Sequence, residues 1–474
     1  MGIVKELVGA AHRPDEALAM VRFKLKARAA YAASVALRSA SDPMTAKWEF
    51  CYEYLGKVSR SFAMVIMELD DELRDPVCIF YLVLRALDTV EDDTAKDSQA
   101  RIDLCTQFYK KLELPEWSTS EYGYAHEKEL LEQFSAVLAC FGSLPEKYRK
   151  VISDITRRMG KGMAEHIHDK ECISVADYDQ YCFYVAGLVG IGLSSMFVAS
   201  GREDRFFVEN DHLSISMGLF LQKVNIIRDY LEDIHDARTF WPREIWSEFS
   251  PTGELSAFKH PEYRMEAVEC LNAMITDALR HVPDCIQYMS RIQNSFVFNF
   301  VAIPQVMAIG TLAECFNNPL VFEGIVKLRR GLTAKLVMKT KTMSALFKLY
   351  FDFAMNMKKK CQVADASYEL TAMRLNSICD LSLPYIVSSH DLQASNWLFA
   401  LLLVFLSVYL VNRRRDFDVY GIAQAGLPEI QDMAALGALF LCLAYMLVFF
   451  GLQFMRPTIE RTESSLALSY QDSS

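Results

Sequence analysis

The sequence lacks several patterns that define common functional classes. Its 12 cysteines form no CxxC pair and show none of the spacings of zinc sites, so we expect reduced thiols facing a cytosol. Lysine and arginine total 50 against 60 acidic residues, and this net charge of -10 argues against nucleic acid as a partner. No GxGxxG follows a strand pattern, which argues against a Rossmann domain. Residues 1–44 carry charges throughout and no apolar core, so we expect no signal peptide.

Alternation of polar and apolar residues, which is typical of strands, is also scarce. From Thr45 to about Lys360 apolar residues instead recur every three or four positions, with breaks at turn residues such as Asp75-Pro76. This pattern predicts one large all-α domain. We divide the chain into an N-terminal helical extension (1–45), a catalytic domain (46–375), a linker (376–394), an apolar region (395–455) and a disordered tail (456–474).

The apolar region contains two uncharged segments that are long enough to cross a membrane. As helices, residues 395–412 and 433–455 would measure about 27 and 34 Å, against a hydrocarbon core of about 30 Å. We therefore predict a C-terminal transmembrane helical hairpin. The triplet Arg413-Arg414-Arg415 conflicts with a translocated loop, because positive residues favour the cytoplasmic side. A re-entrant first segment or a translocated arginine cluster would each resolve this conflict.

The first pattern that points to a functional site is residues 80–93, FYLVLRALDTVEDD, where an apolar run is followed by a block of carboxylates. At about 100° per residue, Tyr81, Arg85, Asp88 and Asp92 share one narrow helix face. Carboxylates on such a face need a positive partner, because burying an unpaired charge is costly. A divalent cation is the natural candidate.

A second apolar helix ends in the same way, at residues 217–233. Gln222, Asn225, Asp229 and Asp233 lie within one arc of this helix, and Arg228 adjoins Asp229. One such motif alone would favour a solvated acidic helix end. Two of them facing each other predict Mg²⁺ ions gripping a diphosphate leaving group, with Arg85 and Arg228 as phosphate donors. An all-α apolar cavity with aromatic side chains would then shelter a carbocation from water.

These blocks, in order, resemble the signatures of the squalene synthase family, a branch of the squalene/phytoene synthases. The resemblance covers residues 46–345 and the C-terminal apolar pair, through residues 59–62, 80–93, 181–194, 220–233, 298–312 and 326–331. It implies an isoprenoid-synthase-type helical domain with a central cavity. It also implies that two farnesyl diphosphates join head to head into presqualene diphosphate, and that NADPH then reduces this intermediate to squalene.

The resemblance also implies roles for individual residues. Tyr181 resembles the acid/base tyrosine of the first half-reaction, Phe300 the aromatic residue of the second, and Tyr81 shares the first polar face. We expect Phe62, Gln222 and Asn225 to contact substrate. The expected Mg²⁺ ligands are Asp88, Glu91, Asp92, Asp229 and Asp233, and the expected diphosphate or NADPH contacts are Arg60, Arg85, Arg228, Lys327 and Arg329.

Four positions depart from the family pattern, namely Phe183, Ser195, Val224 and Val301. None is an expected metal ligand or phosphate contact, so they bear on the shape of the pocket. We expect a monomer on the endoplasmic reticulum membrane, bound to lipid by the hairpin, with its catalytic domain facing the cytosol. The alternatives are a phytoene-type synthase without reductant, a synthase giving another C30 linkage, or a non-catalytic membrane-tethered lipid-binding protein.

Overall fold

The computed structural model describes residues 42–168 and 172–386, together with residues 16, 18–20 and 22. Every regular element in these ranges is a helix, which confirms the all-α prediction. The chain divides into two units, Met1–Tyr385 and Ile386–Ser474. The predicted spans at 395–412 and 433–455, the Arg413–Arg415 triplet and the tail lie outside the described residues.

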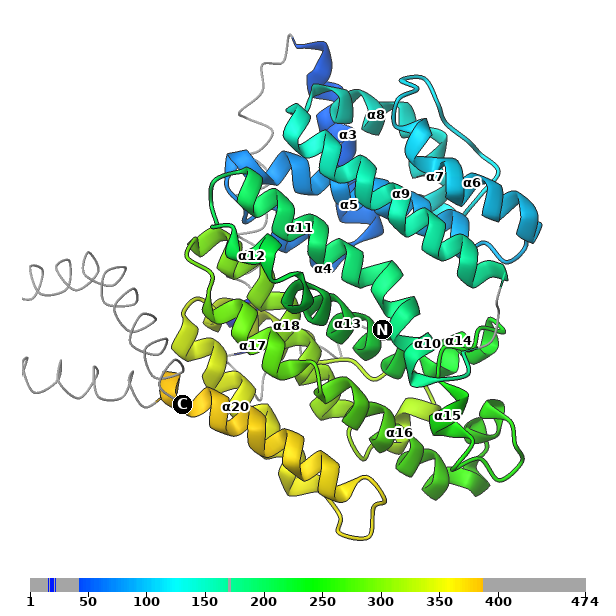
Figure 1. The fold of residues 1–474 in the computed structure, drawn as a ribbon, viewed down its shortest axis with the longest axis vertical. Helices are drawn as coiled ribbons and strands as arrows, with labels where there is room; N and C mark the ends of the chain where they lie inside the picture. The colour runs from blue at the N-terminus through cyan, green and yellow to red at the C-terminus, as the bar shows by residue number, and fades with distance from the viewer. Residues whose placement is uncertain (1–15, 17, 21, 23–41, 169–171, 387–474) are drawn as a thin grey trace, which may run out of the picture. The chain divides into compact units, whose positions relative to one another are not determined.

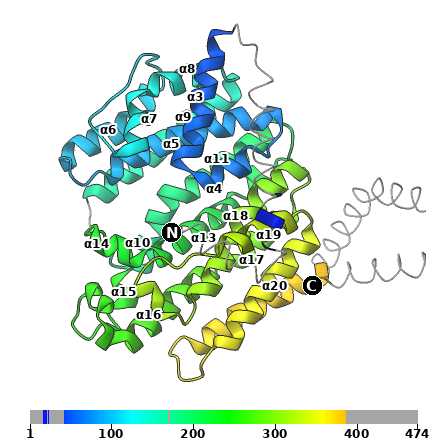
Figure 2. The same ribbon diagram turned by 180° about the vertical axis from the view of Figure 1, so that it is seen from behind.

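The first unit is built from α3 (Pro43–Val58), α4 (Arg60–Ile66), α5 (Asp71–Asp92), α6 (Ser98–Lys111), α7 (Ala125–Glu132), α8 (Phe134–Ser143), α9 (Glu146–His168), α10 (Val175–Cys182), the π-helix η1 (Phe183–Gly187), α11 (Leu188–Ala199), α12 (Phe206–Glu209), α13 (Asp211–Arg228), α14 (Tyr230–His235), α15 (Arg243–Trp246), the 3₁₀ turns η2 (Leu255–Lys259) and η3 (Pro261–Tyr263), α16 (Arg264–Leu279), α17 (Val282–Ser290), α18 (Ser295–Cys315), η4 (Pro319–Phe322), α19 (Arg330–Lys339) and α20 (Met343–Lys360). Figures 1 and 2 show α3 and α5–α9 grouped on one side of α11 and α13, with α16 and α20 on the other side.

Helix α5 carries the first acidic block and begins earlier than the sequence suggested. The Asp70 side chain accepts a hydrogen bond from the backbone N–H of Leu73 at 3.2 Å and caps the helix, and Asp71 and Glu72 follow in the first turn. The break expected at Asp75-Pro76 is therefore wrong. Pro76 lies inside the helix and is buried, because the strong cap fixes the start and the proline removes only one backbone donor.

The second acidic block lies at a junction between two helices. We expected one continuous helix through residues 217–233, but α13 ends at Arg228 and α14 begins at Tyr230. Asp229 between them has φ -94° and ψ 14°, outside the helical region. The backbone N–H of Asp233 still donates to the carbonyl oxygen of Asp229 at 3.0 Å, so the two carboxylates remain one turn apart.

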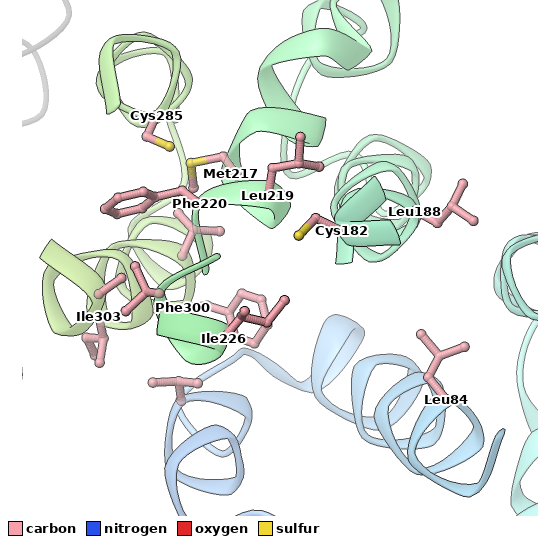
Figure 3. Packing of buried hydrophobic residues seen from close by; sticks show 14 of the residues in the cluster. Leu84, Cys182, Leu188, Met217, Leu219, Phe220, Ile226, Cys285, Phe300 and Ile303 are labelled. Atoms are coloured by element: carbon pink, nitrogen blue, oxygen red, sulfur yellow. The ribbon is translucent and has the colours of Figure 1, made fainter. Parts of the chain in front are cut away.

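Helices α11 and α13 cross at very close range. A Cβ atom on Gly190 of α11 would lie 2.1 Å from the carbonyl oxygen of Ser214, and one on Gly218 of α13 would lie 2.3 Å from that of Ala186. Any side chain at either position would push the backbones apart. Gly190 and Gly218 therefore serve close packing of α13 against its neighbours. Figure 3 shows the neighbouring core, where Phe220 of α13 lies between Cys285 of α17 and Ile303 of α18.

Two helices in the described part of the chain are long and apolar enough to cross a membrane, Val175–Ala199 and Ser295–Cys315. The second of these, α18, is mostly buried within the helical body. The first joins α10, η1 and α11, and its less buried apolar residues line the cavity described below. Both therefore serve as core helices in this structure, and they are weak evidence for a membrane protein.

The last described helix covers residues 368–386 and extends through part of the segment that we predicted as a linker. Its residues Leu375, Ile378 and Ser382 are fully buried, and the rings of Phe347 and Tyr385 lie 4.2 Å apart. Residues 376–385 therefore pack as part of the helical body.

A buried lysine joins three helices behind the acidic motifs. Lys223 of α13 is fully buried, and its Nζ lies 2.5 Å from carboxylate oxygens of both Asp179 of α10 and Asp277 of α16. Arg280 also pairs with both carboxylates. Because α10 carries Tyr181 and α13 leads to Asp229, this network fixes the two parts of the site relative to each other.

Replacing Lys223 by methionine should destabilise the protein by about 3 kcal/mol, because the substitution leaves buried carboxylates short of one partner. Chemical denaturation measures this difference. Lys348→Met is the control, because Lys348 forms an exposed pair with Asp352 and its loss should cost less than about 1 kcal/mol. Equal small losses in the two variants would show that Lys223 does not hold the three helices together.

Candidate active site

The last two turns of α5 gather three carboxylates. Ligand atoms of Asp88, Glu91 and Asp92 all lie within 4.8 Å of one another, and Glu91 is buried. They stand at the carboxyl end of the helix, where the aligned peptide dipoles already place partial negative charge. Arg85 donates to Asp88 at 2.7 Å and to the hydroxyl of Tyr81 at 3.3 Å. The predicted polar stripe is therefore present, and Arg85 alone does not balance the negative charge of the three carboxylates.

The second motif has an arginine of its own. Arg228 grips the neighbouring Asp229 with two hydrogen bonds, from Nε at 2.7 Å and from Nη2 at 2.5 Å. Asp233, one turn later, is buried. Both motifs thus combine carboxylates one turn apart with an arginine beside them, as the sequence suggested.

The structure brings the two motifs together through a residue that the sequence analysis did not single out. Arg238, which follows α14, donates from Nη1 to Asp92 at 2.9 Å and lies 3.0 Å from Asp233 through Nη2. Asp92 belongs to the first motif and Asp233 to the second. The two acidic motifs therefore meet at the guanidinium group of Arg238.

The pKa values of three carboxylates in the joined motifs, Glu91, Asp92 and Asp233, are raised. Burial and the neighbouring carboxylates Asp92 and Asp88 raise the pKa of Glu91 well above its usual range. Although 41% of the Asp92 side chain is exposed, the surrounding protein and the charge of Asp88 raise its pKa to about 7. Burial, opposed by Arg238, also raises the pKa of Asp233 to about 7. The arginines present leave part of the negative charge uncompensated.

A cavity opens beside these helix ends. Its empty volume, including open space at the mouth, is about 1300 Å³. The α5 side of its wall runs from apolar Val77 and Phe80 to polar Arg85 and Asp88. The α13 side runs in the same sense from Met217 to Asn225. Polar groups therefore collect where the two helices end, and the rest of the wall is mainly apolar.

Several residues predicted from the sequence line this cavity. They are Phe62, Tyr81, Arg85, Asp88, Gln222, Asn225 and Phe300. The rings of Phe62 and Tyr81 lie 5.8 Å apart, and Phe300 meets Phe197 edge to face at 6.0 Å. Val301 is the one departure from the family pattern that reaches the described cavity wall. The side chain of Arg60 lies outside the described part of the structure.

Tyr181 lies next to the acidic motifs, although it does not line the cavity. Its ring stacks on Phe240 at 4.9 Å and lies 4.3 Å from His166. A π-helical turn, Phe183–Gly187, follows it, and such turns occur frequently at functional sites. Burial, reinforced by the charges of Glu91, Asp92 and Asp88, raises the pKa of Tyr181 well above its usual value. The phenol is therefore neutral while those carboxylates lack a cation.

Two of the predicted diphosphate or NADPH contacts, Lys327 and Arg329, do not lie in the cavity wall. Lys327 and Arg329 are exposed on the segment that leads into α19, and they are not among the residues lining the cavity. Arg329 lies 3.3 Å from Glu16, a residue of the N-terminal extension. The structure thus groups the two acidic motifs with the aromatic cavity and leaves the predicted NADPH contacts apart from them.

Sequence reasoning missed Arg238, Phe240 and His166. Arg238 and Phe240 follow shortly after the second acidic motif in the sequence. Arg238 could have been found by searching near the five predicted carboxylates for a cation that neutralises them. His166 is on α9, and no pattern near it points to Tyr181.

Comparison with known proteins agrees with this geometry. The sequence model of the family described as Squalene/phytoene synthase matches residues 55–331. The chain is 49% identical to a squalene synthase of Solanum lycopersicum over 372 residues, which cover 77% of this chain and 86% of that protein. It is also 49% identical to squalene synthase 8 of Panax ginseng over 368 residues, which cover 77% and 90% of the two chains.

A solved structure agrees as well. The complex of TcSQS with the ligand BPH1237 superimposes with a TM-score of 0.70 at 43% identity, covering 72% of this chain and 99% of that chain. The family match includes α5, α13 and α14, the elements that carry both acidic motifs. The chain belongs to the squalene/phytoene synthase family, whose members are enzymes of the prenyltransferase kind.

Proposed function

We propose that this enzyme joins two farnesyl diphosphates head to head into presqualene diphosphate and then reduces this intermediate with NADPH to squalene. The observation that carries the proposal is the meeting of the two carboxylate motifs at Arg238, next to a mainly apolar cavity that Asp88 of the first motif lines. The relatives named squalene synthase favour squalene over a phytoene-type product. A non-catalytic lipid-binding protein would have no use for the paired carboxylates.

The acidic motifs suit Mg²⁺. The oxygens of Asp88, Glu91 and Asp92 lie within 4.8 Å of one another, and carboxylates are the hard ligands that this ion prefers. Burial, and after it the charge of the neighbouring carboxylates, raises the pKa of Glu91 and of Asp92, and a bound cation would oppose both effects. When bound, Mg²⁺ neutralises charge on the diphosphate as it leaves. Asp88, Glu91, Asp92, Asp229 and Asp233 would hold the ions, while Arg85 and Arg228 donate to phosphate oxygens.

The cavity would hold the two farnesyl chains. Its wall is mainly apolar, which suits isoprenoid chains, and polar groups gather at one end of it. Phe62, Tyr81 and Phe300 present aromatic faces that stabilise a developing carbocation, and the apolar wall excludes water that would quench it. Gln222 and Asn225 stand beside Asp88 at the polar end and would orient the diphosphate-bearing head of the substrate.

Tyr181 would act as the base that accepts the proton released in the condensation. Formation of the cyclopropane ring releases one diphosphate and one proton. The Tyr181 hydroxyl stands in the field of Glu91, Asp92 and Asp88, which now disfavours its phenolate. Neutralising these carboxylates removes part of that field, so the tyrosine becomes a better base when the motifs are occupied.

Lys327 and Arg329 would bind phosphate groups of NADPH, which supplies the hydride of the second half-reaction. Both side chains are exposed and positively charged, and Arg329 already pairs with a carboxylate at 3.3 Å. We further propose that the chain acts as a monomer tethered to the endoplasmic reticulum by residues 395–412 and 433–455. The catalytic body would then face the cytosol and pass an insoluble C30 product to lipid.

Asp88→Asn and Asp229→Asn should each lower the rate of farnesyl diphosphate consumption by at least about 100-fold, because each removes a charged metal ligand. Release of diphosphate, followed at saturating Mg²⁺, measures the loss. Asp154→Asn is the control, since Asp154 only pairs with Arg157 and Arg158 on the surface of α9. Near-normal turnover in either site variant would refute the magnesium assignment.

Product analysis with and without NADPH tests the second half-reaction. The wild-type enzyme should form squalene only with NADPH and should accumulate presqualene diphosphate without it. Lys327→Ala combined with Arg329→Ala should raise the KM for NADPH about tenfold or more, since two phosphate contacts are lost. Lys359→Ala, an exposed lysine of α20, should behave like wild type. A stable hydrocarbon formed without NADPH would instead identify a phytoene-type synthase.

Removing residues 387–474 should give an active enzyme that remains in the supernatant, whereas the full chain should sediment with membranes. The cut follows the helix at 368–386, because Ile378 and Ser382 are fully buried and an earlier cut would open the core. Sedimentation and the product assay, performed on both proteins, measure the two properties. A folded but inactive truncated protein would show that the removed residues complete the site.

A further inference from the structure

Arg238 holds a distinctive place among the ion pairs of the described residues. Arg85 pairs with Asp88 inside the first motif, and Arg228 pairs with Asp229 inside the second. Arg238 reaches both motifs, through Asp92 at 2.9 Å and Asp233 at 3.0 Å. It therefore stands where a cation shared by the two motifs would stand.

The bridge is held in place, but its hydrogen bonds are incomplete. The backbone N–H of Arg238 donates to the carbonyl oxygen of Asp233 at 2.8 Å, which fixes the start of the loop. The guanidinium lies 5.8 Å from the centre of the Phe240 ring, and the side chain is 24% exposed. Its Nε is buried and has no acceptor among the described residues. One donor of this guanidinium group is therefore available to another acceptor.

We propose that Arg238 is a built-in counter-cation that takes the place of a divalent ion between the two motifs in the empty enzyme. Asp92 and Asp233 must leave the guanidinium before they ligate metal. The inference rests on the proposed binding of Mg²⁺ at these motifs. Arg238 thus acts as a positioning residue, because it keeps two repelling helix ends close together until metal arrives.

The exchange also couples metal binding to diphosphate binding. A guanidinium group released from Asp92 and Asp233 keeps only the contact of its Nη2 with Asp236, at 3.3 Å. The oxygens of a diphosphate would provide further acceptors in the fork geometry that arginine favours. Mg²⁺ alone offers the arginine nothing in return for Asp92 and Asp233. The free enzyme should therefore bind Mg²⁺ weakly, and the arginine should be the cause.

Titration of the metal-free full chain with Mg²⁺ alone tests this inference. Arg238→Gln should bind Mg²⁺ about tenfold more tightly than wild type, because removing one positive charge a few ångströms from a divalent ion is worth about that factor even in a water-like dielectric. Arg238→Lys keeps the charge and should bind like wild type. Isothermal titration calorimetry measures the three dissociation constants.

Arg264→Gln is a matched control. Arg264 is also paired with a carboxylate, Glu323 at 3.3 Å, lies 5.7 Å from the centre of the Phe322 ring, and is 20% exposed. This variant should leave the Mg²⁺ affinity unchanged. Thermal unfolding adds a second readout, in which Arg238→Gln should lose stability in EDTA and recover most of it with Mg²⁺.

Each outcome decides the question. An unchanged or weaker Mg²⁺ affinity in Arg238→Gln, or an equal loss of stability with and without Mg²⁺, would reduce Arg238 to a structural ion pair. A response to Mg²⁺ in Arg238→Gln but not in wild type would support the inference most strongly. If neither protein binds Mg²⁺, the inference fails. The proposed squalene synthesis is then judged separately by the product assay.

Discussion

Repulsion between carboxylates is the constraint on which the rest of this structure depends. The first acidic motif ends α5, where the helix dipole adds negative charge, and the second lies at the α13–α14 junction. Left alone, α5 and the α13–α14 junction would move apart. The tight crossing at Gly190 and Gly218 and the buried Lys223 network hold α13 against its neighbours. The packing of the helical domain therefore keeps the carboxylates close together, and this arrangement favours the binding of a cation.

The helices depart from regularity where the site needs it. Helix α13 stops at Arg228, so that Asp229 can turn toward its arginine, while the hydrogen bond from Asp233 keeps the one-turn spacing. The π-helical turn after Tyr181 is the other departure, and it lies between the tyrosine and the close helix crossing.

Helical periodicity was enough to predict the all-α fold and both acidic motifs, because each of these depends on spacing within one helix. It also placed Tyr81, Arg85, Asp88, Gln222 and Asn225 on the faces that line the cavity, whereas Phe300 came from the family resemblance. What it could not predict depends on contacts between distant segments. Arg238 meets Asp92 across 146 positions of sequence, and Lys223 reaches Asp277 from another helix. The helix break predicted at Pro76 was wrong for a related reason. The cap at Asp70, six residues earlier, fixes the start of the helix and outweighs the tendency of proline to end it.

The arrangement also separates the two charges that ionisation of an allylic diphosphate would create. The anion would stay at the polar end, and the carbocation would extend along the mainly apolar wall. The few polar groups of the wall are already engaged there. Tyr288 shares a hydrogen bond with Ser194 at 2.8 Å, Ser214 donates to Asp211, and the amide nitrogen of Gln305 donates to Met217. These hydrogen bonds hold the polar groups in fixed positions, and the apolar remainder of the wall excludes the water that would quench the cation.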